Sequence, residues 1–378
     1  MIQFHSTFIW PYVRYSVLPA ASADRKRAAS IAPFGVPVPG IVSPKMMHDL
    51  GVSRHHTVII DTPMYLNPFH LLCGKPVIGF DPREQTRFGV FPRHRPEAVE
   101  WFATEACCIF HTVNTWDETS KAAGRPATVH MLACRVSGRG NGPSFVYAAG
   151  GLPVPEHVDV GEAHSKSREE CRLYYYQFAL NSNPPEIAQQ WALSAIPFEL
   201  PHIPRHLAMT ATRFVYGCSV RRGDYAEQLA DSLKLSSLVK IDVRELIARG
   251  IKSPPTAAAE CVDERSVSDI LAADDPDDPV RIFPMPERWY AQECAFVPRA
   301  GGASEDDGWL PTFAFDESQL DSNGDAPESA RSELWIIDAR TMRYVVARIR
   351  LPRRVPYGLH GNWFSAEDIA LQHPVAAF

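Results

Sequence analysis

Two short runs near the end of the chain, Leu334-Trp335-Ile336-Ile337 and Tyr344-Val345-Val346-Ala347-Arg348-Ile349, are rich in β-branched and aromatic residues and predict strands. Similar runs recur between clusters of Pro, Gly, Asn and Asp at residues 57–60, 128–132, 172–176 and 213–216. Many short strands with turn residues between them indicate an all-β barrel, sandwich or propeller. No Gly-rich phosphate loop follows any of them, which argues against a nucleotide-binding fold. No repeat of fixed period is visible, so periodicity does not choose among the three architectures.

Length and composition narrow the class of protein. The chain has 378 residues, which at about 150 residues per domain suggests two domains or one large one. Its 33 prolines against 22 glycines argue against a helical bundle or coiled coil, because proline breaks helices. The net charge of -6 is the opposite of the basic footprint of a nucleic-acid binder. We therefore expect no nucleic-acid partner. No run of 18 apolar residues predicts a membrane-spanning helix.

The cysteines do not form a disulfide framework or a zinc site. There are eight of them, without a C-x-x-C pair, and scattered thiols are typical of a reducing compartment, so the predicted location is the cytoplasm. A cysteine hydrolase that pairs Cys107 or Cys108 with His111 is an alternative, but no motif for an oxyanion hole or a third catalytic group supports it.

The segment 224–275 differs from the rest, because its residues 225–233 and 243–248 carry helical patterns. We expect a helical insertion, or cap, on a β scaffold.

Three of the fourteen histidines stand out by their context. His48 precedes a turn and a strand, His111 ends an apolar run, and His360 lies between glycines that permit a close backbone approach. Their separations are too long for a local metal finger, but they suit distant strands that each send one imidazole to a common axis. From the spacing alone, core or surface histidines remain the alternative.

Several longer motifs, however, occur in one order along almost the whole chain and resemble the carotenoid cleavage oxygenase family. They are Met46-Met47-His48-Asp49-Leu50, Phe110-His111-Thr112-Val113-Asn114, Phe198-Glu199-Leu200-Pro201, Arg213-Phe214-Val215-Tyr216-Gly217, Phe296-Val297-Pro298-Arg299, Glu305-Asp306-Asp307-Gly308-Trp309, Asp338-Ala339-Arg340-Thr341-Met342 and Pro356-Tyr357-Gly358-Leu359-His360-Gly361. The resemblance implies a seven-bladed β-propeller in a single domain that covers residues 1–378.

The resemblance also implies an Fe(II) ion on the propeller axis, held by histidines alone, with open positions for O2. His48, His111 and His360 match three of the family's four ligands. Glu199 and Glu305 match glutamates that accept from the imidazole N–H groups and fix their tautomers.

One departure from the family pattern concerns the first ligand. In the family it lies in a His-Pro-Lys-like turn before the blade that residues 4–15 resemble. Here only His5 precedes His48, and it falls within a predicted strand. We therefore expect an N-terminally truncated member that lacks at least its first blade.

For a complete member, the resemblance implies cleavage of a carbon–carbon double bond of a carotenoid or apocarotenoid by O2, giving two carbonyl products. An apolar tunnel would select the bond. Trp101, Phe102 and Trp363 are candidates to line it, although core packing is the plainer role for each. Cleavage of a stilbenoid, or a non-catalytic remnant without stable iron, are the alternatives. Because polyenes partition into lipid, peripheral membrane contact is also expected.

Overall fold

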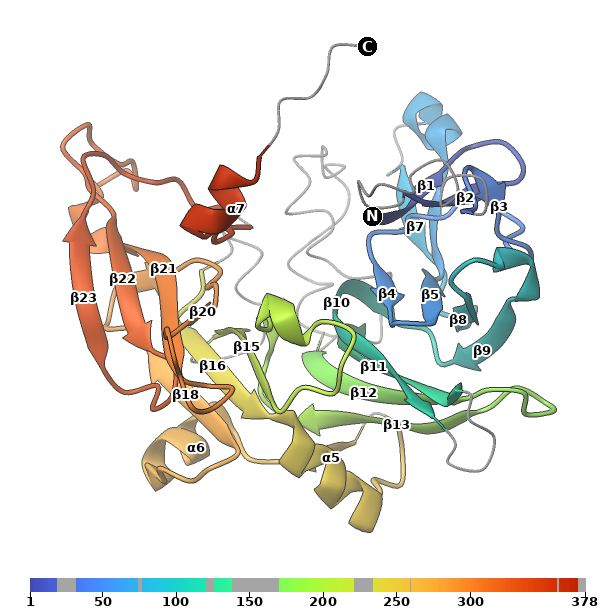
Figure 1. The fold of residues 1–378 in the computed structure, drawn as a ribbon. Helices are drawn as coiled ribbons and strands as arrows, with labels where there is room; N and C mark the ends of the chain where they lie inside the picture. The colour runs from blue at the N-terminus through green and yellow to red at the C-terminus, as the bar shows by residue number, and fades with distance from the viewer. Residues whose placement is uncertain are drawn as a thin grey trace.

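The chain folds into β-sheets with few helices (Figure 1). The computed structural model describes residues 1–18, 32–73, 77–119, 126–137, 170–220, 234–258, 260–358 and 360–372. All six runs that the sequence predicts to be strands lie on strands, so the all-β class is confirmed. In Figure 1 the sheets follow one another in chain order around a common centre, from blue on the right through green and yellow to orange on the left.

The N-terminal third forms three small sheets. One has the order β1-β2-β3, a second β4-β5-β8-β9, and a third pairs β6 with β7. Strand β5 is buried along its whole length, as expected for its continuous apolar run. The elements are β1 (Ile2–Ser6), β2 (Val13–Val17), β3 (Val36–Pro37), β4 (Leu50–Val52), β5 (His56–Asp61), β6 (Met64–Leu66), η1 (Pro68–Cys73), β7 (Ile78–Phe80), β8 (Thr86–Pro92), η2 (Pro96–Ala98) and β9 (Glu100–Thr104).

A five-stranded sheet of order β10-β11-β12-β13-β17 occupies the middle of the chain. Alternate residues of its strands point to opposite faces, and each face belongs to a different hydrophobic cluster. Leu132 and Tyr175 lie in one cluster, and Met131 and Tyr176 in the other. The strands are β10 (Cys108–Thr119), β11 (Pro126–Ser137), β12 (Glu170–Ala179), β13 (Ile187–Ser194) and β17 (Cys261–Asp263).

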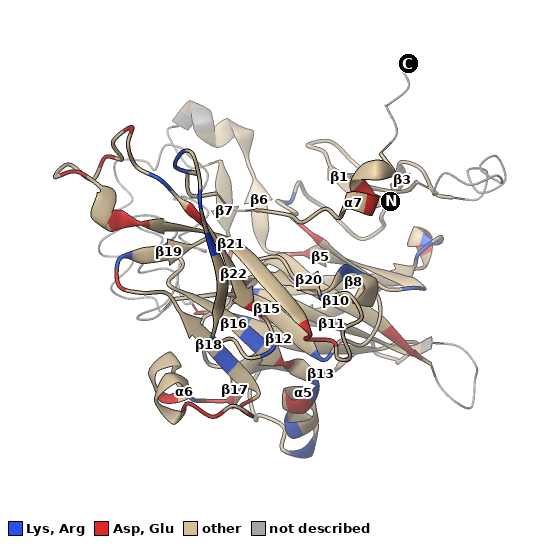
Figure 2. Cartoon of the chain, turned by 60° about the vertical axis from the view of Figure 1, so that its left-hand side comes forward, with Lys and Arg blue, Asp and Glu red and all other residues tan. Residues whose placement is uncertain are grey.

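The next sheet has the order β14-β15-β16-β18. It includes β14 (Glu199–His202), β15 (Phe214–Ser219), β16 (Ser237–Asp242) and β18 (Val280–Pro284), with the helices η3 (Arg205–Leu207), α5 (Val243–Lys252) and α6 (Val267–Ala273) beside it. On α5, Glu245 and Arg249 form an ion pair one turn apart, and Figure 2 shows the red and blue segments side by side.

The segment 224–275 is therefore mixed rather than wholly helical. Helices α5 and α6 lie within it, but so does β16, an inner strand whose six residues are all buried and which pairs with β15 and β18. The helical pattern at residues 225–233 lies outside the described residues. The described part of the segment therefore contributes an inner strand to the sheet as well as two helices beside it.

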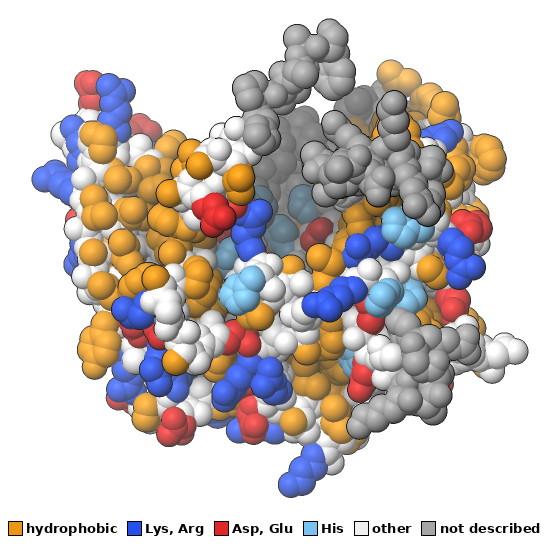
Figure 3. Space-filling model, viewed as in Figure 1, with side chains coloured by type: hydrophobic (Ala, Val, Ile, Leu, Met, Phe, Trp, Pro, Cys, Tyr) orange, Lys and Arg blue, Asp and Glu red, His pale blue; other side chains and the backbone are white. Residues whose placement is uncertain are grey.

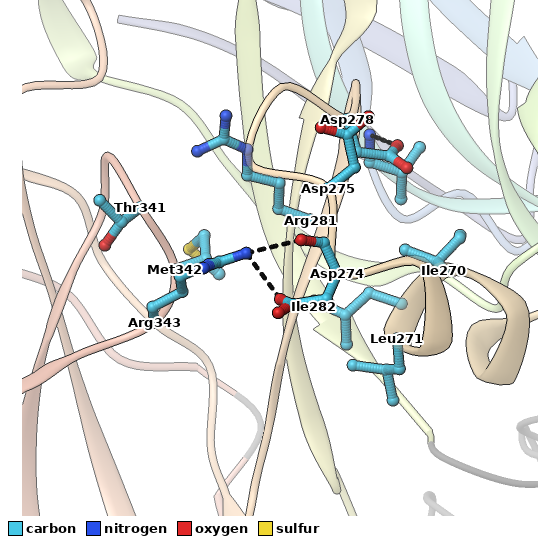
Figure 4. Close-up of a pocket in the computed structure, with 11 residues that line it drawn as sticks. Ile270, Leu271, Asp274, Asp275, Asp278, Arg281, Ile282, Thr341, Met342 and Arg343 are labelled. Atoms are coloured by element: carbon cyan, nitrogen blue, oxygen red, sulfur yellow. Dashed lines mark hydrogen bonds and ion pairs between the residues drawn. The ribbon is translucent and has the colours of Figure 1, made fainter.

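The C-terminal sheet has the order β19-β21-β22-β23, with β20 paired to β21. Arg343, in the turn before β23, donates to the carboxylate and the carbonyl of Asp274 at the end of α6, which closes one side of the small pocket in Figure 4. The elements are β19 (Trp289–Ala291), β20 (Val297–Pro298), β21 (Gly308–Asp316), η4 (Glu317–Gln319), β22 (Glu333–Asp338), β23 (Val345–Arg350) and α7 (Ala366–Ala370).

Candidate metal centre

His111 lies within strand β10 and is the most enclosed of the three candidate histidines. The pairing of β10 with β11 shifts register on both sides of it, between Ile109 and His111 and between Thr112 and Asn114. Such irregularities re-aim side chains. The Nδ1 atom of His111 is hydrogen-bonded to Oε2 of Glu199 at 2.7 Å, while its Nε2 atom is buried and has no hydrogen-bond partner among the described residues. Since Nδ1 holds the proton that Glu199 accepts, Nε2 presents a lone pair.

The backbone around Glu199 fixes its carboxylate. The fully buried ring of Phe198 packs against Gly217, where a Cβ atom would come within 2.5 Å of it. Leu200 has a φ of 51°, in the left-handed region that a leucine rarely adopts. Its N–H donates to Oε2 of Glu199 at 2.7 Å. The strained backbone thus accompanies a hydrogen bond that holds the carboxylate toward His111.

His48 lies in the segment just before β4 and is positioned by its neighbour. Asp49 accepts hydrogen bonds from the backbone N–H and the hydroxyl of Thr112, both at 2.7 Å. Because Thr112 follows His111 directly on β10, this pair joins the segment of His48 to the strand of His111. The two imidazole centroids lie 5.4 Å apart with nearly perpendicular planes.

His360 lies in the segment after β23 and is half exposed. Its centroid is 5.1 Å from that of His111, again with nearly perpendicular planes. Nδ1 of His360 is hydrogen-bonded to Oε2 of Glu293 at 3.2 Å, and the Gly361 N–H donates to the same oxygen at 2.8 Å. The structure therefore brings His48, His111 and His360 together around His111. In Figure 3, histidine side chains (pale blue) gather beside a hollow in the centre of this face.

The surroundings of His111 and His48 shift the pKa values of the two rings in opposite directions. Burial lowers the pKa of His111, but the hydrogen bond and charge of Glu199 outweigh it, so the pKa is raised. Burial and the neighbouring His111 lower the pKa of His48. Burial also raises the pKa of the Glu293 carboxyl. His48 therefore stays neutral more readily than His111, and the neutral form is the one in which imidazole binds a metal.

Glu305 and His5 do not join this cluster. Oε1 of Glu305 accepts from the hydroxyl of Thr212 and from the N–H groups of Arg213 and Phe214, so it caps the start of β15. The glutamate that is hydrogen-bonded to His360 in the cluster is Glu293. It lies outside the motifs of the sequence analysis, three residues before the motif at residues 296–299. His5 is exposed on β1, opposite Arg14.

The donor set fits a metal that prefers imidazole. Two imidazoles that bind one metal at about 2.1 Å place their centroids about 5 Å apart, close to the spacing of both ring pairs. Within the described ranges, however, no group of three or more His, Cys, Asp or Glu side chains is already arranged to hold a metal ion. The Nε2 atom of His111 is thus available to bind a metal, whereas the three neighbouring histidines do not yet form a complete metal site.

Two of the three aromatic candidates are packed within the protein, and the third is exposed. Phe102 is fully buried against Phe88 and Phe178 in the core, as the plainer interpretation predicted. Trp101 packs on Gly40 and Gly89. Trp363 is 47% exposed, close in sequence to His360.

Both cysteines of the hydrolase alternative are buried away from solvent. Burial raises the pKa of the Cys107 thiol, which is hydrogen-bonded to Thr86. Cys108 lies against the sulfur of Met64. Neither is placed as a nucleophile, because the reactive form is the thiolate.

Comparison with known proteins decides the family. The model of the retinal pigment epithelial membrane protein family matches residues 1–365. The chain belongs to the carotenoid cleavage oxygenase family. Among curated proteins it is 43% identical to the carotenoid dioxygenase carX of Gibberella fujikuroi, over 99% of this chain and 58% of that protein. It is 27% identical to the carotenoid 9,10(9',10')-cleavage dioxygenase of Crocus sativus, over 96% of this chain and 54% of that protein.

Solved structures support the same fold. Cobalt-substituted Synechocystis ACO matches with a TM-score of 0.62 and 16% identity, over 96% of this chain and 60% of that one. The lignostilbene dioxygenase of Pseudomonas brassicacearum matches with a TM-score of 0.59 and 20% identity, over 87% of this chain and 58% of that one. The chain thus spans little more than half the length of these relatives. No helix in the described parts of the chain has the length and hydropathy needed to cross a bilayer.

Proposed function

We propose that this chain cleaves a carbon–carbon double bond of a carotenoid or apocarotenoid with O2, giving two carbonyl products. The observation that carries the proposal is the buried Nε2 atom of His111, in a member of this family. This atom has no hydrogen-bond partner in the described parts of the chain, and the rings of His48 and His360 flank it. The similarity to a carotenoid dioxygenase at 43% identity favours this substrate class.

His48, His111 and His360 would hold Fe(II), which when bound supplies a place for O2 to bind and be activated. The chain's own groups prepare for it. Glu199 holds the proton of the neutral His111 ring at Nδ1, which leaves Nε2 as the atom that would bind the metal. Glu293 does the same for His360 over a longer hydrogen bond. Asp49 holds the segment of His48 beside β10 through Thr112.

We also propose that the sheets are blades of a propeller whose axis passes near these histidines, within one domain. Two observations support it: the chain-order arrangement of the sheets around a centre, and the origin of the three histidines in the segment before β4, in β10 and after β23. A seven-bladed ring is what the family resemblance implies.

Iron analysis and product analysis test the proposal together. The purified chain, loaded anaerobically with Fe(II), is expected to hold about one iron per chain. His111→Ala should lose it, while His206→Ala, an exposed position on η3, should keep it. Equal iron content in both variants would contradict the assigned centre.

The substrate class is tested by incubating the loaded chain under O2 with β-carotene, an apocarotenal and resveratrol. We expect aldehydes from a carotenoid or apocarotenoid and none from resveratrol. Products from resveratrol alone would favour a stilbenoid. Bound iron without product from any of them would favour a non-catalytic form.

We further propose a cytoplasmic chain with peripheral membrane contact. Supporting it, four large apolar side chains after His360 are exposed: Trp363, Phe364, Ile369 and Leu371. Flotation with liposomes should carry the chain upward, and a Trp363→Ser, Phe364→Ser double variant should remain below. Equal flotation of the unaltered chain and the double variant would contradict membrane contact through these side chains.

A further inference from the structure

A buried tyrosine on the five-stranded sheet is hydrogen-bonded to a histidine that lies outside the proposed metal centre. The hydroxyl of Tyr175 and Nδ1 of His130 are 2.8 Å apart. Nε2 of His130 is 3.1 Å from Oε2 of Glu118, whose side chain is 66% exposed. Tyr175 and His130 are 2% and 6% exposed as residues. A buried phenol is thus connected to a surface carboxylate through one imidazole.

The sheet register explains why these groups meet. Trp116 lies directly opposite His130, and Glu118 lies opposite Thr128 two residues away. Tyr175 is diagonal to His130 on the next strand and directly opposite Trp191. Paired residues share a face, so all of these side chains project from one face of the sheet.

Nε2 of His130 lies within hydrogen-bond distance of Oε2 of Glu118 and, at 3.2 Å, of the Thr128 hydroxyl, which itself donates to Oε2 of Glu118 at 3.4 Å. In the tautomer that carries its proton on Nε2, Glu118 accepts that proton and Nδ1 accepts from the Tyr175 hydroxyl. Burial lowers the pKa of His130, which keeps the imidazole neutral, with one ring nitrogen unprotonated. Burial raises the pKa of Tyr175, so the phenol does not ionise by itself near neutral pH.

Aromatic rings lead from this pair toward solvent. Trp116 is partly exposed and stacks on His130 with the planes 4° apart and the centroids 5.1 Å apart. The centroids of Trp116 and Tyr175 are 6.4 Å apart, and those of Tyr175 and Trp191 are 5.6 Å apart. Tyr175 is too buried to touch a substrate, so the chemistry open to it is electron transfer, which needs no direct contact with the reactant.

We infer that Tyr175, His130 and Trp116 form a one-electron redox site, in which Tyr175 gives an electron through Trp116 to a high-potential one-electron oxidant at the protein surface. The O–H bond of Tyr175 breaks and an N–H bond forms at Nδ1 of His130. The electron reduces the oxidant, a neutral tyrosyl radical remains, and the imidazolium is paired with the Glu118 carboxylate. Charge is therefore not left uncompensated in the core.

A flash-quench experiment tests this on the purified full chain, with photogenerated tris(bipyridine)ruthenium(III) as the oxidant and electron paramagnetic resonance as the readout. The chain has twelve tyrosines, and exposed ones such as Tyr344 also react. The buried radical is expected as a long-lived signal that Tyr175→Phe removes. Tyr216→Phe is the matched control, because that hydroxyl is buried and without a partner among the described residues. Retention of the long-lived signal in Tyr175→Phe would overturn the proposal.

The role of His130 is tested with His130→Gln, whose amide can still hydrogen-bond to the phenol but is not a base. Formation of the long-lived radical should slow about a hundredfold, the lower end of what a positioned proton acceptor contributes. An unchanged rate in a variant that remains folded by circular dichroism would leave only a structural hydrogen bond. If that variant does not fold, the rate of Tyr175 oxidation is measured on the unaltered chain in H2O and in D2O. Oxidation should be slower in D2O, because a proton moves together with the electron. Equal rates in the two solvents would overturn the coupled proton transfer.

Discussion

The two ends of the histidine cluster are built in different ways. His111 and Glu199 both project from strands, their hydrogen bond is 2.7 Å long, and Glu199 is supported by a buried ring and a strained backbone. His360 lies in a segment after the last strand, is half exposed, and makes a longer hydrogen bond to Glu293. The difference indicates that His111 is held between two strands, whereas His360 is held in an irregular segment by a longer hydrogen bond. We call the side of the cluster with His111 and Glu199 the strand end, and the side with His360 and Glu293 the loop end. We expect changes at the strand end to have larger effects than equivalent changes at the loop end.

The largest effect is expected on stability from Phe198→Ala. Removing this fully buried ring beneath Glu199 should cost about 3–5 kcal/mol of the free energy of unfolding. The matched change at the loop end, Trp363→Ala, removes a half-exposed ring and should stay within about 0.5 kcal/mol. Chemical denaturation measures both, and similar losses would remove the contrast between the two ends.

The second effect concerns the proposed iron. Glu199→Gln should weaken metal affinity about 10–100-fold, the usual cost of removing a hydrogen-bond partner behind a ligating histidine. Glu293→Gln should cost less, because its bond to His360 is longer and more exposed. Titration of the metal-free chain with Co(II), followed by absorbance, compares the variants. A greater loss in Glu293→Gln would place the tighter ligand at the loop end.

A third comparison uses one glycine from each end. Gly217→Ala places a methyl group in the space of the Phe198 ring and should cost about 1–3 kcal/mol. Gly361→Ala meets nothing within 4 Å and should change stability by less than about 0.5 kcal/mol. Thermal unfolding separates the two. A neutral Gly217→Ala would mean that the Phe198 ring can move without loss.

The smallest expected effect is a pH dependence at the strand end. Burial lowers the pKa of His202, on the same strand as Glu199, to about 4. Because the folded value lies below the unfolded one, the stability that neutral His202 contributes is present above about pH 6.5 and declines as pH falls toward 4. Between pH 7 and 5 the unaltered chain should lose about 1–2 kcal/mol more than His202→Gln. Parallel stability curves for the two chains would contradict it.

The sequence predicted the strands from short local patterns, whereas the grouping of the three histidines followed only from the family resemblance of the motifs around them. Residues 57–60 and 128–132 alternate or run apolar as strands do, and each histidine lies in a motif of its own. Glu293 could not be found in this way, since its partner His360 is 67 residues away and only the tertiary fold brings them together.

Two features of the structure do not follow from local sequence patterns, for physical reasons. Residues 305–307 are all acidic, and the sequence does not say which partner each one meets. Glu305 caps β15, Asp306 pairs with Lys240, and Asp307 with Arg299. Strand β16 lies between helical patterns, and a short buried strand cannot be told from a buried helical turn by periodicity alone.

The two register shifts that flank His111 also limit how this chain can change in evolution. A strand with regular pairing tolerates a slip of register only by turning every side chain to the other face. In β10 a single inserted or deleted residue between the shifts would turn His111 away from Glu199 while Trp116 kept its place. Differences in length among relatives should therefore collect in the β10–β11 connection, and the spacing between His111 and Asn114 should stay constant.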